Sequence, residues 1–205
     1  MKVLDSFSQF SKKLYGAIAE QLNSRAKKNR KNVEFKIRLS IESWIRDQPE
    51  IEDLLGNSER SMNYLFGLEP GKAERAVEHI VKAISDSIII DMPKISNRLE
   101  SKIEFRLSAN LFGRLILDSS ANVITEKGTR LEWLNWLLQE GDKIIIYGYH
   151  YRTGDNGRSG GGTMVKRGVF RVPPEFSGTI DDNFITRAFL GREEELSNII
   201  QGLFR

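Results

Sequence analysis

The sequence predicts an α+β protein with a helical N-terminal half, a small antiparallel sheet with a long projecting β-hairpin, and C-terminal helices. Three observations predict this class. Apolar residues recur at spacings of three and four through most of residues 6–87. Residues 144–151 and 163–172 are rich in β-branched and aromatic residues, as strands are. Helical spacing returns within residues 179–203, after the Pro-Pro pair of "VPPEF".

Residues 1–48 are expected to form a basic helical region. Its first part carries one apolar stripe at helical spacing, made of Phe7, Phe10, Leu14, Ile18 and Leu22. Residues 33–41 fit two structures. Their alternation suits a strand, with Val33, Phe35, Ile37, Leu39 and Ile41 on one side. A helix accounts equally well for Ile37, Ile41, Trp44 and Ile45. We favour the helix because the pattern continues to Gln48 and stops at Pro49.

Residues 49–205 are expected to form one continuous α+β core. "PEIEDLLG" predicts a short helix that ends at Gly56, and "LEPGKAERAVEHIVKAISDS" a longer helix with Pro70 near its start. "SIIIDMP" then predicts a strand that ends at Pro93. "KIEFRLSANL" alternates strictly and predicts a half-exposed strand, which "GRLILDSS" would continue beyond Gly113.

The second half of the core contains the hairpin. "GTRLEWLNWLLQEGD" predicts a helix capped by Thr129, with Glu132 as its capping-box partner and Gly141 at its end. "KIIIYGYHY" and "TMVKRGVFRV" predict the two strands of a hairpin arm at residues 144–172. C-terminal helices are expected at residues 179–203, opened by a capping box of Thr179 and Asp182 and interrupted near Gly191.

The glycine-rich stretch "GDNGRSGGG" joins the two strands of the arm. It is not a phosphate-binding P-loop, because no Lys follows the spaced glycines and a strand rather than a helix comes next. We therefore expect an extended tip with Arg158 near its apex. Ordering so many glycines costs entropy, so we expect contact with a neighbouring subunit to fix the tip.

Composition excludes several classes of protein. There is no Cys, which excludes disulfides, thiolate metal sites and Cys nucleophiles and is typical of a protein folded in a reducing cytosol. No stretch of about 18 apolar residues predicts a transmembrane helix, and "MKVLDSFSQFSKK" does not resemble a signal peptide. The chain has only two His residues and no G-x-S-x-G or H-E-x-x-H motif, so we expect neither an enzyme nor a metal or other cofactor.

The charge of the chain is unevenly distributed along the sequence. Residues 12–38 carry a net charge of +7, whereas residues 39–205 carry −4. This basic segment is either the solvated face of a helix or a surface for nucleic acid or an acidic partner. The residues with which it would contact DNA or an acidic partner are Lys27, Lys28, Arg30 and Lys31. A DNA-binding accessory protein is therefore one alternative function. A less favoured alternative is a metal-dependent nuclease that uses Glu140 and Asp142.

The hairpin arm has basic residues of its own, namely Arg152, Arg158, Lys166, Arg167 and Arg171. Two interpretations of these residues remain open. At alternate positions they would face phosphates or an acidic neighbour together. Alternatively, they keep an exposed strand edge from pairing with other chains.

Several long strings carry a resemblance to a known group of proteins. They are "WLNWLL", "EGDKIII", "RSGGGTMV", "VPPEFSGT" and "DNFITRA", together with the earlier "QPEIEDLL" and "YLFGLEPG". In these strings the chain resembles a group of tailed-bacteriophage virion proteins of the neck, or tail-completion (head–tail joining), type. The resemblance covers roughly residues 38–190.

The resemblance implies a structural protein of the virion, assembled in the host cytoplasm, with no enzymatic activity and no membrane partner. It would act as a head–tail connector, tail-completion or tail-terminator protein in a ring of about six or twelve copies. Neighbouring neck, portal or tail proteins, and DNA in the channel, would be its partners. The matched positions, for which assembly or fold roles are implied, are Trp133, Trp136, Arg158, Met164, Pro173, Pro174, Phe176, Asn183, Phe184 and Arg187.

Overall fold

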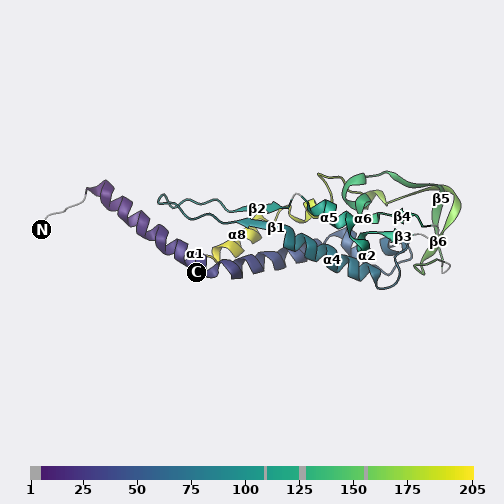
Figure 1. The fold of residues 1–205 in the computed structure, drawn as a ribbon, viewed down its shortest axis with the longest axis horizontal. Coiled ribbons are helices and arrows are strands. Elements are labelled where there is room, and N and C mark those ends of the chain that lie inside the picture. The colour runs from purple at the N-terminus through teal and green to yellow at the C-terminus, as the bar shows by residue number, and fades with distance from the viewer. Residues whose placement is uncertain (1–5, 109, 125–127, 155–156) are drawn as a thin grey trace. The chain divides into compact units, whose positions relative to one another are not determined.

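The computed structural model describes residues 6–108, 110–124, 128–154 and 157–205 (Figure 1). Contacts within the chain divide it into two compact units. Unit 1 contains residues 1–40, 88–108 and 191–205, and unit 2 contains residues 41–87 and 109–190. Unit 1 thus combines residues from both ends of the chain. The boundary between the units falls at residue 40, within the first helix, whereas the sequence indicates a boundary at residue 48.

Unit 1 is organised around α1, the helix Phe7–Arg46. Strands β1 (Ile88–Asp91) and β2 (Glu104–Leu107) form an antiparallel ribbon in which Ile88 pairs with Leu107. The ribbon lies along α1, because the side chain of Asn23 exchanges hydrogen bonds of 3.0 and 2.8 Å with the backbone of Ile95 (Figure 1). Helix α8 (Glu193–Gln201) also belongs to unit 1, and the residues after it receive hydrogen bonds from Asn29.

Residues 33–41 are helical, as we favoured, and belong to α1. Val33, Ile37 and Ile41 are at most 3% exposed, whereas Phe35 and Leu39 are exposed. The alternating apolar residues therefore occupy different faces of one helix. The helix stops at Arg46, three residues before Pro49, as the proline indicates.

Unit 2 contains most of the short elements. Its helices are α2 (Pro49–Leu54), α3 (Met62–Leu65), α4 (Lys72–Ser87), α5 (Leu111–Leu117), α6 (Trp133–Asn135) and α7 (Phe184–Ala188). A π-helix, η2 (Trp136–Glu140), continues α6, and short 3₁₀ turns lie at η1 (Ser119–Ala121) and η3 (Pro174–Phe176). The strands are β3 (Val123–Ile124), β4 (Arg130–Leu131), β5 (Ile144–Thr153) and β6 (Gly162–Arg171).

The core of unit 2 joins these elements. It includes large side chains that are at most 2% exposed and come from α1, α2, α3, α4, α6, η2 and α7, among them Trp44, Ile45, Ile51, Leu54, Met62, Val77, Ile80, Ile84, Trp133, Leu134, Leu137, Leu138, Phe184 and Ile185. Phe66 stacks on Trp133 with ring centroids 5.6 Å apart, next to this group. The helical spacing seen in the sequence thus becomes one buried cluster, and its burial supplies the main stabilising free energy of the unit.

The class is α+β, with helices in the N-terminal half and at the C-terminus, as the sequence predicts. Within the described residues, the strands form three separate antiparallel pairs, β1–β2, β3–β4 and β5–β6, rather than one small sheet. The expected strand over "GRLILDSS" is wrong. Residues 113–117 belong to α5, and Ser119 and Ser120 belong to η1. Leu111, the last residue of the expected strand "KIEFRLSANL", is also part of α5, because it and Leu115, four residues later, both turn into the core. Ala109, assigned to the preceding strand, lies outside the described residues.

Both capping boxes expected from the sequence are wrong. Residues 130–131 form β4, so the helix in "GTRLEWLNWLLQEGD" begins at Trp133, after Glu132 and not after Thr129. Gly141 does end this segment, at a φ of +59° that favours glycine. The C-terminal helix α7 begins at Phe184 and is capped by Asn183, not by Thr179.

Candidate interaction surfaces

The hairpin arm is kinked by irregular pairing. Strands β5 and β6 pair antiparallel from Ile144 opposite Arg171 to Thr153 opposite Gly162, as expected, with two shifts of register. One shift places the left-handed residues Gly148, Arg167 and Gly168 together, with φ of +78°, +87° and +95°. Such bulges bend a ribbon and increase its twist.

The described part of the hairpin tip folds back onto its own chain. The Arg158 guanidinium donates hydrogen bonds to the carbonyl oxygens of Gly67 (3.1 Å) and Ile124 (2.5 Å). Ser159 is 4% exposed, and its hydroxyl donates to the Tyr64 carbonyl at 3.1 Å. Residues 157–162 are therefore held by contacts within their own chain. Asp155 and Asn156, in the same loop, lie outside the described residues.

The basic residues of the arm do not share one face. Arg152 is opposite Thr163 and Lys166 is opposite Tyr149, and Thr163 and Lys166 are three positions apart on β6. Side chains alternate between faces along a strand, which places Arg152 and Lys166 on opposite faces. Arg171 donates to Asp142 at 2.8 Å, and Arg167 lies in the bulge. The register therefore does not produce a single basic surface here.

The other matched residues lie mostly in structural positions. Met164 is half-buried opposite Tyr151, and Phe176 is half-buried in η3. Asn183 is fully buried: its Oδ1 accepts from the amides of Ile185 and Thr186, and its Nδ2 donates to carbonyls that include Thr179 at 2.7 Å. These contacts assign Asn183 a role in the fold.

Arg187 connects two carboxylates. Its guanidinium bonds to Glu50, whose side chain is 2% exposed, and to Asp182 at 2.7 Å. Burial raises the pKa of Glu50 above its ordinary value, and the charge of Arg187 opposes this rise. Glu50 lies in the first turn of α2, and nothing in the sequence around it indicates that it is buried.

A groove of ≈ 760 Å³ lies between the hairpin and the α2–α3 segment, both in unit 2. Its walls include cations (Arg60, Arg152 and Arg171), carboxylates (Asp53 and Glu175) and the apolar run Val172–Phe176. Burial raises the pKa of Asp53, although the carboxylate accepts a 2.7 Å hydrogen bond from the Met62 amide. The lining is mixed in charge and has no single chemical preference.

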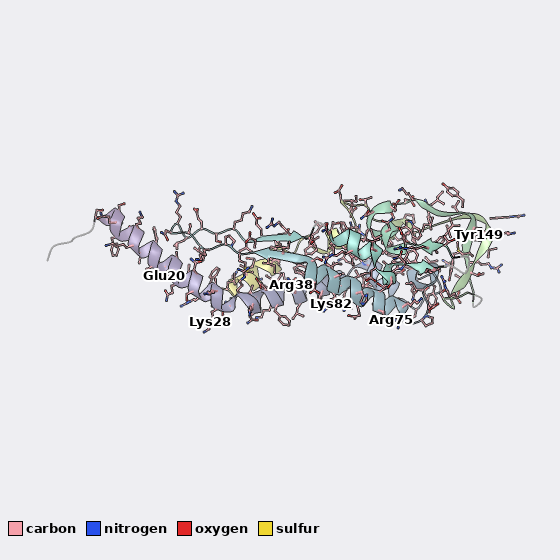
Figure 2. The ribbon with its side chains drawn as sticks, in the orientation of Figure 1. Glu20, Lys28, Arg38, Arg75, Lys82 and Tyr149 are labelled. Carbon is pink, nitrogen blue, oxygen red and sulfur yellow. The ribbon has the colours of Figure 1, made fainter. Side chains whose placement is uncertain are left out.

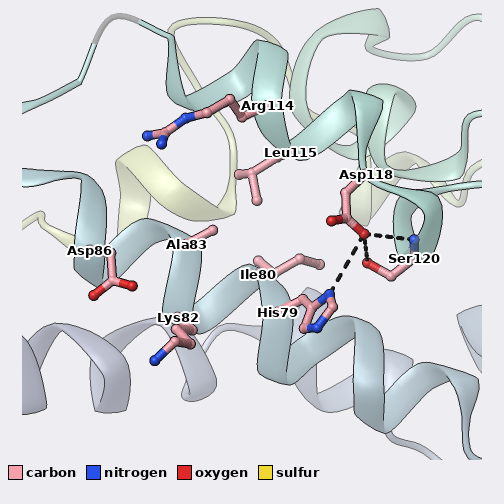
Figure 3. Close-up of a pocket in the computed structure, with 9 residues that line it drawn as sticks. All are labelled: His79, Ile80, Lys82, Ala83, Asp86, Arg114, Leu115, Asp118 and Ser120. Carbon is pink, nitrogen blue, oxygen red and sulfur yellow. Dashed lines mark hydrogen bonds and ion pairs between the residues drawn. The ribbon is translucent and has the colours of Figure 1, made fainter.

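A smaller depression of ≈ 280 Å³ lies between α4 and α5 (Figure 3). His79 Nδ1 is 3.7 Å from Asp118 Oδ1, and the hydroxyl and amide of Ser120 donate to the same oxygen (Figure 3). The Ser120 hydroxyl, followed by its amide, lowers the pKa of Asp118. His79 is an exposed helix residue, as its sequence position indicates.

The two carboxylates of the nuclease alternative each face a cation of the same chain. Glu140 forms an ion pair with Lys143, and Asp142 pairs with Arg171 at 2.8 Å. Among the described residues, no group of three or more His, Asp or Glu side chains is arranged to hold a metal ion.

The first turns of α1 carry an exposed apolar face. Phe7, Phe10, Leu14 and Tyr15, which we call the α1 apolar face, are 86%, 57%, 46% and 47% exposed. The turn of the β1–β2 ribbon comes near Gly16, since a Cβ there would lie 3.9 Å from Asn97 Oδ1. Figure 1 shows α1 continuing past this turn towards its N-terminus. The sequence reveals the apolar stripe that begins at Phe7, but only the structure shows that Phe7, Phe10 and Leu14 are exposed.

The basic segment of α1 divides into two groups. Arg25 and Arg38 donate to the backbone carbonyls of Phe204 and Ile88, each at 3.1 Å, and so hold unit 1 together. Arg30 pairs with Glu34 at 2.7 Å. Lys27, Lys28 and Lys31 are exposed, and Figure 2 marks Lys28 on the helix. Of the four residues expected to contact DNA or an acidic partner, these three lysines are therefore the ones best placed to do so.

The charge is segregated between the two units. Unit 1 has sixteen Lys and Arg against nine Asp and Glu, a net charge of +7. Unit 2 has fifteen against nineteen, a net charge of −4. Within the described part of the chain, no helix combines the length and apolar character needed to cross a membrane. Comparisons with models of protein families, with curated proteins and with solved structures found no match to this chain.

Proposed function

We propose that the chain is a structural assembly protein that associates with further copies of itself in the neck or upper tail of a tailed bacteriophage. The single observation that carries the proposal is the α1 apolar face, whose four large side chains are all at least 46% exposed. Exposed apolar patches of this kind mark surfaces that are covered in an assembly. The position in the virion rests on the sequence resemblance described above.

The proposal specifies a ring of about six or twelve copies that is built from non-catalytic contacts. It differs from the sequence-based expectation that contact with a neighbouring subunit fixes the hairpin tip. Arg158 and Ser159 hold the described tip against Gly67 and Tyr64 of the same chain, so α1 replaces the hairpin as the assembling element.

The proposal is tested by measuring the mass of the assembled protein. Native mass spectrometry and light scattering of the purified chain, over a wide range of concentration, should show a defined oligomer of several copies. Labelled antibodies should bind at the neck of phage particles made from the genome that encodes the chain. A protein that stays monomeric at every concentration and is missing from the particles contradicts the proposal.

A DNA-binding accessory role is the second candidate. The observation that favours it is the exposure of Lys27, Lys28 and Lys31 on one stretch of α1. Lysine side chains on a helix can contact the phosphate backbone of DNA. Such contacts do not depend on the base sequence.

A further inference from the structure

We infer that the chain assembles head to tail, with the α1 apolar face of one copy docked on the acidic helical segment 41–87 of the next copy. This inference rests on the function proposed above, because it presupposes that copies associate. It adds which surface of one copy meets which surface of its neighbour, and it therefore sets the symmetry of the contact.

The α1 apolar face is the donor surface. Phe7, Phe10 and Leu14 follow one another at spacings of three and four, so they lie on one side of the helix. This face belongs to unit 1, whose net charge is +7. A helix face of this kind is recognised by a surface that offers both apolar contact and negative charge.

The charge of the units decides which surface receives it. Two copies that met through unit 1 on both sides would bring together two groups of net charge +7. A contact between unit 1 of one copy and unit 2 of the next brings +7 against −4 and is attractive. The charges therefore oppose a symmetric contact between two copies of unit 1. They favour a contact between unit 1 of one copy and unit 2 of the next.

Within unit 2, the negative charge is concentrated in residues 41–87. This segment has ten Asp and Glu against five Lys and Arg, whereas the rest of the unit has a net charge of +1. Leu55, which is 40% exposed, comes three residues after Glu52 and four residues before Glu59 in the sequence, and both carboxylates are exposed. We call these three residues the acceptor patch. They combine an apolar contact with negative charge, as the donor requires.

The two cavities of unit 2 described above are poorer acceptors than this patch. The groove beside the hairpin is lined by Arg60, Arg152 and Arg171, whose charge repels a basic helix. The depression between α4 and α5 contains Lys82 and Arg114 as well as Asp86 and Asp118.

A contact between unlike surfaces does not close at two copies. Each copy in a dimer still has one free donor and one free acceptor, so growth continues until a ring closes or a filament forms. This property allows the contact to be tested by mixing two defective variants.

The donor variant is Phe7→Ser/Phe10→Ser/Leu14→Ser, and the acceptor variant is Glu52→Lys/Leu55→Ser/Glu59→Lys. Each variant alone should be monomeric by light scattering, because one side of every contact is damaged. An equimolar mixture should form one-to-one dimers that grow no further, because one intact donor and one intact acceptor remain. The matched control is Glu175→Lys/Asp181→Lys, which reverses two exposed carboxylates of unit 2 outside the acceptor patch and should assemble like the wild type.

A photo-crosslinking measurement covers the case in which a variant fails to fold. The full chain with a benzophenone side chain in place of Phe10 should crosslink to residues 41–87 of an isotope-labelled second copy. Crosslinks to α1 of the second copy instead would overturn the inference and indicate a symmetric contact.

The remaining outcomes separate this inference from the proposed function. If the wild type assembles but the mixture of variants stays monomeric, the head-to-tail contact is wrong and the assembly function stands. If the donor variant assembles normally but loses retention on duplex DNA, α1 serves nucleic acid and the inference is overturned. A wild type that is monomeric throughout contradicts both.

Discussion

Asn183 is a fully buried residue whose side chain caps the N-terminus of α7. Both its amide oxygen and its amide nitrogen are bonded, the oxygen to the N-terminus of α7 and the nitrogen to carbonyls that include Leu138 in η2. The hydroxyl oxygen of Thr186 accepts a hydrogen bond from the backbone N–H of Asn183 and completes the capping box. The side chain thereby links the start of α7 to the preceding π-helix.

At the same scale, the ion pair of Glu50 and Arg187 leads to a pH-dependent prediction. Arg187→Met should lower the free energy of unfolding by about 3 kcal/mol at neutral pH, because a buried carboxylate loses its counter-charge. Burial raises the pKa of Glu50 above its ordinary 4.5, and loss of Arg187 raises it further. A carboxyl with a raised pKa in the folded state contributes stability below its ordinary pKa, and this contribution is lost as the pH rises through the folded value.

The difference between Arg187→Met and the wild type should therefore shrink as the pH falls towards 4.5 and below. Urea unfolding at a series of pH values measures it. Asp182→Asn is the control, since this exposed partner should cost less than about 1 kcal/mol. A difference of equal size at acidic and neutral pH would show that the Glu50 charge is not the cause.

At the scale of elements, the hairpin combines a long antiparallel ribbon with a tip that belongs to the packing of unit 2. Gly161 is essential to this packing, because a Cβ at that position would lie 2.4 Å from Tyr64 Cδ1. Arg158 and Ser159 hold the tip through hydrogen bonds within the same chain. The entropy cost of ordering its glycines is offset within one chain.

Gly161→Ala should displace the tip and lower stability by about 1–3 kcal/mol, because the added methyl group clashes with the Tyr64 ring. Hydrogen–deuterium exchange should rise in residues 157–162 of the variant. Gly113→Ala in α5 is the control, since nothing lies within 4 Å of the added methyl group and alanine favours a helix. If the wild-type tip exchanges rapidly in dilute, monomeric protein, the intersubunit explanation regains support.

At the scale of the whole molecule, the distribution of charge matters more than its total. The chain has a net charge of +3, yet its two units carry +7 and −4. Such segregation steers association between unlike surfaces and makes association sensitive to salt.

The DNA-binding alternative also belongs to this scale. If α1 contacts duplex DNA, Lys27→Gln/Lys28→Gln/Lys31→Gln should weaken binding and reduce the slope of log affinity against log salt concentration by about 3. Filter binding at several salt concentrations measures the slope. Arg75→Gln/Lys82→Gln on α4 (Figure 2) is the control and should leave the slope unchanged. An unchanged slope in the lysine variant dismisses DNA binding through α1.

The local pattern of the sequence determined much of this protein. Periodicity and prolines predicted α1, α2, α4, β1 and the β5–β6 hairpin, because spacing and backbone restriction are local properties. Strict alternation in "KIEFRLSANL" predicted a strand that continued into "GRLILDSS". Leu111, at the end of the first string, and Leu115, in the second, instead belong to a helix. A short apolar run fits both a strand and a helix until a core is present to choose between them.

Tertiary structure alone decided the surfaces. Strand register placed Arg152 and Lys166 on opposite faces, and folding of the tip brought Arg158 to Gly67, 91 residues earlier in the chain. The fold buries Glu50, although nothing in the sequence around it indicates this. It exposes 86% of Phe7, although the sequence presents Phe7 and Ile18 as members of one stripe. Exposure and pairing depend on what lies opposite a residue in space, and residues far apart in sequence determine that.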